Sequence, residues 1–333
     1  MKIAVLGAGA WGMSMAYLLF ENGHDVYVWE FSEKAVQEIL QTRELKGKLD
    51  GFKIPEKIII SSNINYVMDC AEVIVNAVPT QFIRGYFNSI KEYDFSKKIL
   101  VNVSKGIEAS TGEDIRTIFL ESFETITDDN FVILAGPSFA NEVTIKRSPT
   151  TVVSACKNIE TANKIRDLFS SKFFRVYSNS DVIGVEIGGS IKNIIAIAAG
   201  IHDGMDLGNN SKAALLTRGL AEMTRFGVKM GAKRETFSGL TGIGDMILTC
   251  NSILSRNYQV GFRIGKGERL NDILASMTMV AEGVETARIA RKLSLDNEVE
   301  MPITEIVYEI LFNDVAPQLA VPKLMLREKK EED

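Results

Sequence analysis

Short runs of apolar, often β-branched residues recur through the first half of the chain, and stretches with helical periodicity separate them. The runs predict strands over residues 2–6, 25–29, 57–60, 73–78, 99–103, 132–134, 150–154 and 174–177. Strands that alternate with helices are typical of a parallel sheet with helices on both faces. Ligands of such sheets bind beyond the carboxyl ends of the strands, so polar residues at those ends become candidates for a site.

The pattern changes near residue 180, after which only helices are predicted. Their apolar periodicity covers residues 212–230, 256–265, 270–277 and 284–293. Asn210 or Ser211 is expected to cap the helix that starts near residue 212. The length of 333 residues also favours about two domains. We therefore expect an α/β domain over residues 1–180 and an all-helical domain over residues 181–330.

Residues 185–201 predict a helix that is apolar on every side except at Lys192. Such a helix is normally buried. The ammonium group must therefore pair with a counter-charge, extend into a solvent-filled cleft or lose its proton. Gly188 and Gly189 precede the lysine by one turn, and their missing side chains predict a cavity in front of it. The alternative interpretation is a lysine whose stem follows apolar surface to solvent or to a buried carboxylate.

The first strand leads into a glycine-rich turn, GAGAWG (residues 7–12), then a helix, then a second strand that ends at Glu30. This context predicts a Rossmann-type dinucleotide site, in which Gly7 allows the tight turn, Gly9 lets the pyrophosphate approach and Gly12 lets helix and strand pack closely. A carboxylate at Glu30 can accept a hydrogen bond from a ribose 2′-hydroxyl and repels a 2′-phosphate. The sequence therefore predicts NAD(H) rather than NADP(H).

Composition excludes several other classes of function. The net charge is −5 and the basic residues are scattered, so no surface for nucleic acid is predicted. Cys70, Cys156 and Cys250 are widely spaced and histidines number only two, which fits neither a disulfide framework nor a metal site and favours a reducing cytoplasm. Residues 3–20 are apolar enough for a membrane span, but their glycines break the run, and we expect no membrane span.

Polar residues follow several of the predicted strands. These candidates are Asn76, Asn102, Ser104, Lys105 and the segment Gly136-Pro137-Ser138. In the helical half, Asp245 follows a flexible Gly-Ile-Gly segment, and Ser255 is expected to cap a helix that starts at Arg256. Free N–H groups at that helix end, together with a guanidinium, make a site for an anion. The alternatives are a helix N-cap for Asp245 and solvated surface cations for Lys105 and Arg256.

Seven motifs occur together along the chain. Besides the nucleotide turn they are SKGIE (104–108), GPSFANE (136–142), IGGSIKNIIAIAAGI (187–201), GLTGIGDMILTC (239–250), SRN (255–257) and VAEGVETA (280–287). In this order, over roughly residues 2–320, the chain resembles the soluble NAD(P)-dependent glycerol-3-phosphate dehydrogenase family. The resemblance implies interconversion of dihydroxyacetone phosphate and sn-glycerol 3-phosphate, a precursor of glycerophospholipids. This reaction requires no metal.

The resemblance also implies roles for individual residues. Lys192 would be the catalytic acid/base, assisted by Lys105 and Asp245. The substrate would contact Lys105, Gly136, Ser138, Lys192, Asn193, Asp245, Ser255, Arg256 and Asn257. The cofactor would contact Gly7, Gly9, Ala10, Trp11, Gly12, Glu30, Phe31, Lys105, Ala140, Arg256, Val280 and Glu282. Many bacterial relatives carry Ser in place of Ala10, a departure that removes a hydroxyl contact to the phosphates. Many also carry a basic residue or His near positions 30 and 31, where this chain has Glu30 and Phe31, and this departure argues against use of NADPH.

The expected chemistry suits a lysine. Hydride addition to a ketone leaves negative charge on its oxygen, which needs a proton or a nearby cation. Burial and the charge of Lys105 would lower the pKa of Lys192, whereas Asp245 would raise it.

Two other classes of protein remain open. In dehydrogenases of the β-hydroxyacid or 6-phosphogluconate type an amide usually follows the lysine by one helical turn, but here position 196 is Ala and the amide is Asn193. A non-catalytic redox sensor would need only the first domain. The joint retention of four candidate site residues argues against it, namely Lys105, Lys192, Asp245 and Arg256. The apolar helical domain makes a homodimer plausible.

Overall fold

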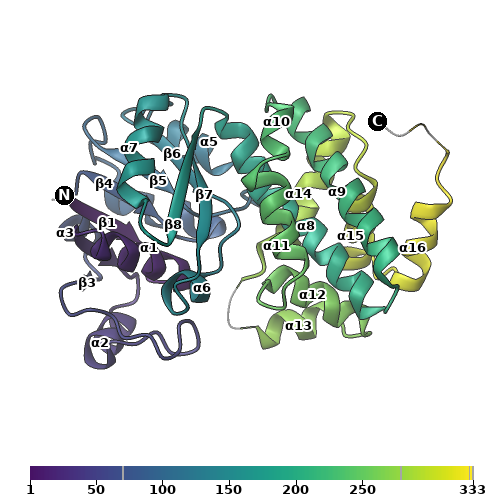
Figure 1. The fold of residues 1–333 in the computed structure, drawn as a ribbon, viewed down its shortest axis with the longest axis horizontal. Coiled ribbons are helices and arrows are strands. Elements are labelled where there is room, and N and C mark those ends of the chain that lie inside the picture. Colours follow the sequence, from purple (N-terminus) through teal and green to yellow (C-terminus); the bar gives the residue numbers. More distant parts are fainter. Residues whose placement is uncertain (70, 278–279, 330, 332–333) are drawn as a thin grey trace. The chain divides into compact units, whose positions relative to one another are not determined.

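The computed structural model describes residues 1–69, 71–277, 280–329 and 331; Cys70 lies outside the described residues. The chain divides into two compact units, Met1–Glu186 and Ile187–Asp333, whose elements are labelled in Figure 1.

The first unit is built on one eight-stranded sheet. Its strands are β1 (Lys2–Leu6), β2 (Asp25–Trp29), β3 (Ile59–Ser61), β4 (Val73–Asn76), β5 (Ile99–Asn102), β6 (Phe131–Ala135), β7 (Thr150–Ala155) and β8 (Phe174–Asn179). They are ordered β3-β2-β1-β4-β5-β6-β7-β8. All eight predicted strands are present, and the predicted α/β fold of Rossmann type is confirmed.

One strand pair departs from the predicted parallel sheet. β7 runs antiparallel to β6, whereas every other neighbouring pair is parallel. The connection over residues 136–149 contains only α6 (Ala140–Thr144), a helix of five residues. At about 1.5 Å per residue this helix is too short to return the chain along a five-residue strand of about 17 Å. The chain therefore enters β7 at the edge where it left β6, and the GPSFANE motif stays at that edge.

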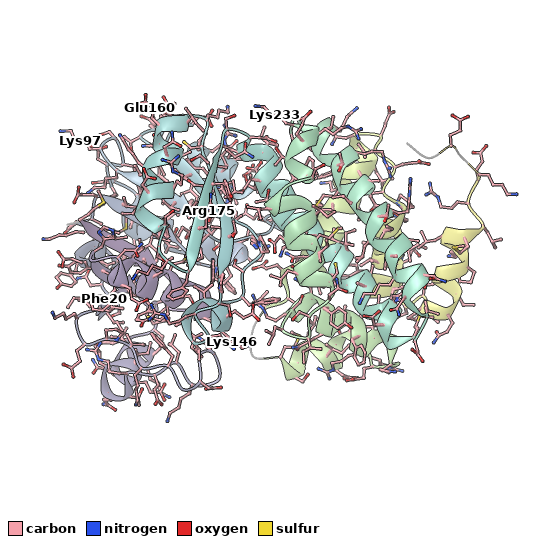
Figure 2. The ribbon with its side chains drawn as sticks, viewed as in Figure 1. Phe20, Lys97, Lys146, Glu160, Arg175 and Lys233 are labelled. Atoms are coloured by element: carbon pink, nitrogen blue, oxygen red, sulfur yellow. The ribbon has the colours of Figure 1, made fainter. Side chains whose placement is uncertain are left out.

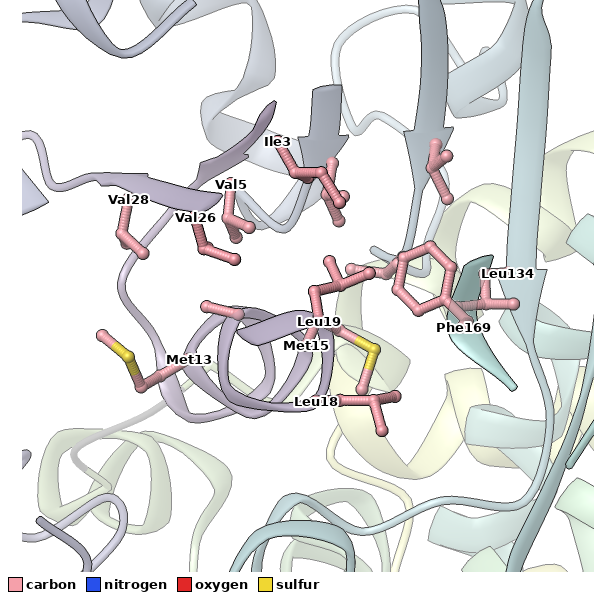
Figure 3. Close-up of a cluster of buried hydrophobic side chains, with 14 of the residues drawn as sticks. Ile3, Val5, Met13, Met15, Leu18, Leu19, Val26, Val28, Leu134 and Phe169 are labelled. Carbon is pink, nitrogen blue, oxygen red and sulfur yellow. The ribbon is translucent and has the colours of Figure 1, made fainter. Parts of the chain in front are cut away.

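Helices cover this sheet. They are α1 (Ala10–Glu21), α2 (Glu33–Thr42), α3 (Ile64–Asp69), α4 (Ile83–Phe87), α5 (Ile115–Ser122), α6 and α7 (Ile159–Phe169), with short 3₁₀ turns η1 (Thr80–Phe82) and η2 (Asn88–Ile90). Figure 3 shows Met15 and Leu19 of α1 beside Phe169 of α7 and Ile3 and Val5 of β1, all members of one buried cluster. Each such side chain contributes about 1.5–3 kcal/mol when fully buried.

The second unit is helical throughout its described residues. It contains most of α8 (Val182–Gly204), then α9 (Asn209–Lys229), α10 (Arg234–Phe237), a π-helical turn η3 (Leu240–Gly244), α11 (Asp245–Cys250), α12 (Arg256–Gly265), α13 (Leu270–Ser276), α14 (Glu282–Asp296), α15 (Pro302–Phe312) and α16 (Pro317–Met325). The four helices predicted after residue 204 are α9, α12, α13 and α14. The surface of both units carries charges of both signs, such as Lys97, Glu160 and Lys233 (Figure 2).

The predicted cap of α9 was wrong. The helix begins at Asn209 and its N-cap is Gly208, with φ +82°. The Ser211 hydroxyl lies inside the first turn, 2.9 Å from the Leu207 carbonyl oxygen and 3.1 Å from the Gly208 carbonyl oxygen, and is not the cap. A backbone turn that only glycine adopts readily therefore starts this helix two to three residues earlier than the side-chain pattern predicts.

One helix, α8, is long and apolar enough to cross a membrane by length and composition alone. However, 94% of its most apolar window is buried inside the protein, as in the core helix that the sequence predicts. The apolar run near the N-terminus is divided between β1 and α1.

Candidate active site

The glycine-rich turn between β1 and α1 has the geometry of a nucleotide turn. Gly7 has φ +106°, and a Cβ on Gly12 would lie 2.0 Å from the Gly7 carbonyl oxygen, so both positions require glycine. A Cβ on Gly9 would meet no atom within 4 Å, which leaves space beside the turn. Gly9 is also the N-cap of α1 and offers no side-chain acceptor. The turn and the start of α1 therefore fit the pyrophosphate of a dinucleotide.

The carboxyl end of β2 is followed by the residues that are expected to contact the ribose and the base of the cofactor. Glu30 follows β2 directly, and its Oε1 accepts a hydrogen bond from the Ser32 N–H at 3.1 Å. The Phe31 side chain is 81% exposed and makes an edge contact with Trp29. Lys34, the nearest base in sequence, is exposed. A carboxylate and an aromatic face therefore stand together at this strand end.

Ala10, Trp11 and Ala140 lie near one junction of helices. The Ser14 hydroxyl of α1 donates to the Ala10 carbonyl at 2.8 Å and lies 3.4 Å from the Ala140 carbonyl. The Thr144 hydroxyl of α6 donates to Ser14 at 2.6 Å. These buried hydroxyls link both ends of α6 to α1. Trp11, three residues before Ser14, is half-buried.

The prediction that Asn76 and Asn102 contact a ligand was wrong. Both side chains are fully buried. Asn76 Nδ2 donates to Asn102 Oδ1 at 2.9 Å, and Asn76 Oδ1 accepts from the Tyr86 hydroxyl at 3.0 Å. Asn102 Oδ1 also accepts from the Ser104 N–H at 3.2 Å. Burial also raises the pKa of Tyr86, which keeps it a donor. The pair fixes the loop after β5 instead of facing a ligand.

That loop presents Lys105. The Thr80 hydroxyl donates to the Lys105 carbonyl at 2.9 Å, and Lys105 Nζ lies 3.5 Å from the Gly136 carbonyl oxygen. The Ser138 hydroxyl donates to the same Gly136 oxygen at 3.2 Å. A Cβ on Gly136 would lie 2.8 Å from the Val152 Cα, so this position needs glycine. The structure thus brings together the three first-unit residues that the resemblance assigns to the substrate.

The second unit holds Lys192 in a buried ion pair. Lys192 is 5% exposed, and its Nζ lies 2.6 Å from Asp245 Oδ1 and 2.6 Å from Thr249 Oγ1. The Thr249 hydroxyl donates to the Asp245 carbonyl at 2.6 Å. The counter-charge required by a buried ammonium is therefore Asp245, and the N-cap of α11 is Gly244 instead. Sequence reasoning missed Thr249, although its position four residues after Asp245 on one helix was an available signal.

Gly188 has a different role from the one predicted. A Cβ there would lie 2.5 Å from the Thr241 carbonyl oxygen of η3. The glycine therefore lets α8 and η3 approach each other at backbone distance, which brings Asp245 to Lys192. The expectation that Gly188 leaves an open cavity was wrong, because backbone fills the space.

The predicted cap of α12 is confirmed, and the residues around it converge. The Ser255 hydroxyl accepts from the Tyr258 N–H at 3.2 Å. One Arg256 Nη donates to the Val280 carbonyl at 2.7 Å, and the Asn257 side chain accepts from the Gly283 N–H at 2.9 Å.

Two further observations concern the surroundings of this helix start. Desolvation lowers the pKa of Arg256, and neighbouring Glu282 opposes that shift. A Cβ on Gly283 would lie 2.8 Å from the Asn193 carbonyl oxygen, so α8 and α14 are in close contact there.

The second unit offers neither a reactive thiol at Cys250 nor a metal site among its described residues. Burial raises the pKa of the Cys250 thiol to about 12, which makes it unreactive. Among the described residues, no cluster of three or more His, Cys, Asp or Glu side chains could hold a metal ion.

Two family models match nearly the whole chain. Residues 2–162 match the N-terminus of NAD-dependent glycerol-3-phosphate dehydrogenase, and residues 181–322 match its C-terminus. The chain belongs to this family of dehydrogenases.

Individual relatives agree with the family models over the full length. A glycerol-3-phosphate dehydrogenase (NAD(P)+) of Lysinibacillus sphaericus is 48% identical over 331 residues, 99% of this chain and 98% of the relative. A counterpart from Chlorobium limicola is 45% identical over 332 residues, 100% of this chain and 99% of the relative. The crystal structure of the glycerol-3-phosphate dehydrogenase of Coxiella burnetii superposes with a TM-score of 0.92 at 32% identity, covering 98% of this chain and 99% of that one.

The nucleotide turn of this dehydrogenase gives a direct prediction. Gly12→Ala is expected to weaken NADH binding at least about tenfold, because the new Cβ would collide with the Gly7 carbonyl and open the turn. Fluorescence titration with NADH measures the Kd. Gly85→Ala is the matched control, since a Cβ at that helical glycine meets nothing within 4 Å. An unchanged Kd for the Gly12 variant would contradict the assignment of the turn.

Proposed function

We propose that the protein catalyses reversible hydride transfer between NAD(P)H and dihydroxyacetone phosphate, which gives sn-glycerol 3-phosphate. The observation that carries the proposal is the buried Lys192, held at 2.6 Å by both Asp245 and Thr249 in a member of this dehydrogenase family. Residues 1–180 would bind the dinucleotide and residues 181–330 would provide most of the substrate contacts.

The lysine supports the chemistry of the carbonyl oxygen. Bound NAD(P)H would supply the hydride to the carbonyl carbon. Lys192 would donate a proton to the carbonyl oxygen and regain it from solvent, so that the ketone becomes a secondary alcohol. Asp245 and Thr249 fix the direction of Nζ, because each engages one of its three N–H donors. A group aimed in advance needs little reorganisation as charge develops on the oxygen.

The start of α12 supports binding of the phosphate. Its first-turn N–H groups and the positive end of the helix favour an anion, and Arg256 adds a guanidinium that can bind phosphate through two N–H groups. Ser255 caps this turn, and Asn257 is held by Gly283. The remaining contacts implied by the family resemblance, from Lys105, Gly136, Ser138 and Asn193 to the substrate and from Ala140, Val280 and Glu282 to the cofactor, are proposed on the same basis.

Glu30 and Phe31 support a preference for NADH. The double substitution Glu30→Ala with Phe31→Arg is expected to shift the ratio of kcat/KM for NADH over NADPH at least about tenfold towards NADPH, because it removes a repulsive carboxylate and adds a cation. Initial rates with each cofactor measure the ratio. Glu33→Ala, a nearby exposed acid, should leave the ratio unchanged. A wild type that already prefers NADPH would overturn this interpretation of Glu30.

Initial rates with alternative substrates test the proposed reaction. We expect NADH consumption with dihydroxyacetone phosphate and far slower consumption with a panel of 3-keto acids, because only the former carries a phosphate for the Arg256 site. Turnover of 3-keto acids alone would instead support a dehydrogenase of the β-hydroxyacid type. NADH binding without turnover of any triose phosphate would support a redox sensor.

Three broader proposals have separate grounds. The family resemblance supports a product that serves as a precursor of glycerophospholipids, and the three widely spaced cysteines support a protein that works in the cytoplasm. The apolar helical domain supports a homodimer. Light scattering of the purified protein measures its mass in solution and tests the last of these.

A further inference from the structure

Helices α8 and α12 touch through their backbones. A Cβ on Gly200 would lie 2.1 Å from the Tyr258 carbonyl oxygen, and a Cβ on Gly261 would lie 2.0 Å from the Ile197 carbonyl oxygen. One turn further along each helix, Gly204 and Gly265 make similarly close approaches. We call this contact the glycine crossing, and it consists of Gly200, Gly204, Gly261 and Gly265. Any larger side chain at these positions would push the two helices apart.

A hydrogen-bond network fastens the same two helices beside the crossing. Asp203 of α8 accepts from the Tyr258 hydroxyl of α12 at 2.6 Å and from Lys212 Nζ of α9 at 2.6 Å, and its other oxygen lies 3.0 Å from His202 Nδ1. Desolvation opposes ionisation of Asp203, but the hydrogen bonds from Lys212, Tyr258 and His202 lower its pKa. Burial and Asp203 raise the pKa of Tyr258, so its hydroxyl stays protonated and donates. The His202 ring is held on its other side, where Nε2 lies 2.6 Å from the Ser211 hydroxyl.

The network acts on the two helix segments that carry the proposed chemistry. Tyr258 lies in the first turn of α12, two residues after Arg256, and its N–H donates to the capping Ser255. Lys192 lies on α8 eight residues before Gly200, which is about 12 Å along the helix axis. Backbone contact at the crossing leaves α12 little freedom to slide along α8. The Tyr258 hydroxyl then fixes the rotation of the first turn of α12 about that contact.

We propose that Asp203 and Tyr258 are positioning residues for substrate phosphate: they hold the start of α12, with its N–H groups and Arg256, at a set place relative to Lys192. Neither residue touches the substrate in this account. The inference rests on the proposed function, because it assigns the phosphate to that helix start. It predicts weaker binding of phosphate without loss of the proton donor.

Tyr258→Phe tests the inference, because it keeps the ring and removes only the hydroxyl. We expect the KM for dihydroxyacetone phosphate to rise roughly three- to tenfold, with kcat within about twofold and the KM for NADH unchanged. The Kd for inorganic phosphate, measured by calorimetry, should rise by the same factor. Asp203→Asn should act in the same direction. Tyr308→Phe, the same change in α15, is the matched control.

The outcomes separate this inference from the proposed reaction. If wild type reduces dihydroxyacetone phosphate but both variants keep wild-type KM and phosphate affinity, the inference fails, even if their melting temperatures fall. A change in kcat and in the KM for NADH alone would also overturn it. If wild type does not reduce dihydroxyacetone phosphate, the proposed function fails, and the phosphate Kd values still decide whether Asp203 and Tyr258 position this site.

Discussion

Lys192→Ala is expected to lower kcat for reduction of dihydroxyacetone phosphate by on the order of a hundredfold or more, while the Kd for NADH stays within about twofold. The amine is the proton donor in our account. Asp245 accepts a hydrogen bond from the amine, and the Thr249 hydroxyl already donates its proton to the Asp245 carbonyl, so neither is placed to supply a proton in its place. Steady-state rates and fluorescence titration with NADH measure the two quantities.

The ion pair makes stability a necessary control for this variant. Removing Lys192 leaves Asp245 buried at 1% exposure without its counter-charge, a change that typically costs about 3–5 kcal/mol of folding free energy. Lys192→Met with Asp245→Asn removes both charges and keeps the volume. It should recover much of the melting temperature and stay inactive. Wild-type turnover in either variant would refute the role of Lys192.

Arg256→Ala is expected to raise the KM for dihydroxyacetone phosphate by about a hundredfold, because one partner of a charge-assisted contact with phosphate is lost. The proton donor remains, so kcat should fall much less than kcat/KM. The loss of the bond to the Val280 carbonyl also loosens the segment before Glu282, so a smaller rise in the KM for NADH is expected. Initial rates over a range of both substrates measure these constants.

Arg263→Ala is the matched control on the same helix. Arg263 lies in the last turn of α12 and forms a surface ion pair with Glu268, which typically contributes less than about 1 kcal/mol. Its KM values should match those of wild type. Equal KM values for dihydroxyacetone phosphate in the Arg256 variant and wild type would contradict the proposed phosphate site.

Much of the fold follows from local patterns. All eight strands and the bounds of α12 agree with the sequence, because apolar runs, capping residues and helical periodicity act over a few residues. The antiparallel direction of β7 could not be predicted from these local patterns, because it depends on the short length of the helix that separates β7 from β6. The start of α9 did not follow either, because Gly208 adopts a backbone conformation that leaves no trace in side-chain periodicity.

For single residues of the site, too, the sequence predicts local features but not the contacts that depend on packing. A lysine inside an apolar helix predicts a counter-charge, and Asp245 provides it. The predictions for Gly188 and Asn76 were wrong. The sequence does not show that backbone fills the space beside Gly188, or that Asn76 is buried in a hydrogen bond with another side chain. Thr249 and Tyr258 are ordinary residues in sequence, and only the packing of α8 against α11 and α12 shows their hydrogen bonds.

Transfer of deuterium from NADH labelled at both C4 positions tests the central claim most directly. With wild-type protein and dihydroxyacetone phosphate, the account predicts sn-glycerol 3-phosphate that carries one deuterium on C2, detected by NMR, and much slower formation of this product with Lys192→Ala. NADH that remains unoxidised, or a product without deuterium on C2, would contradict the account.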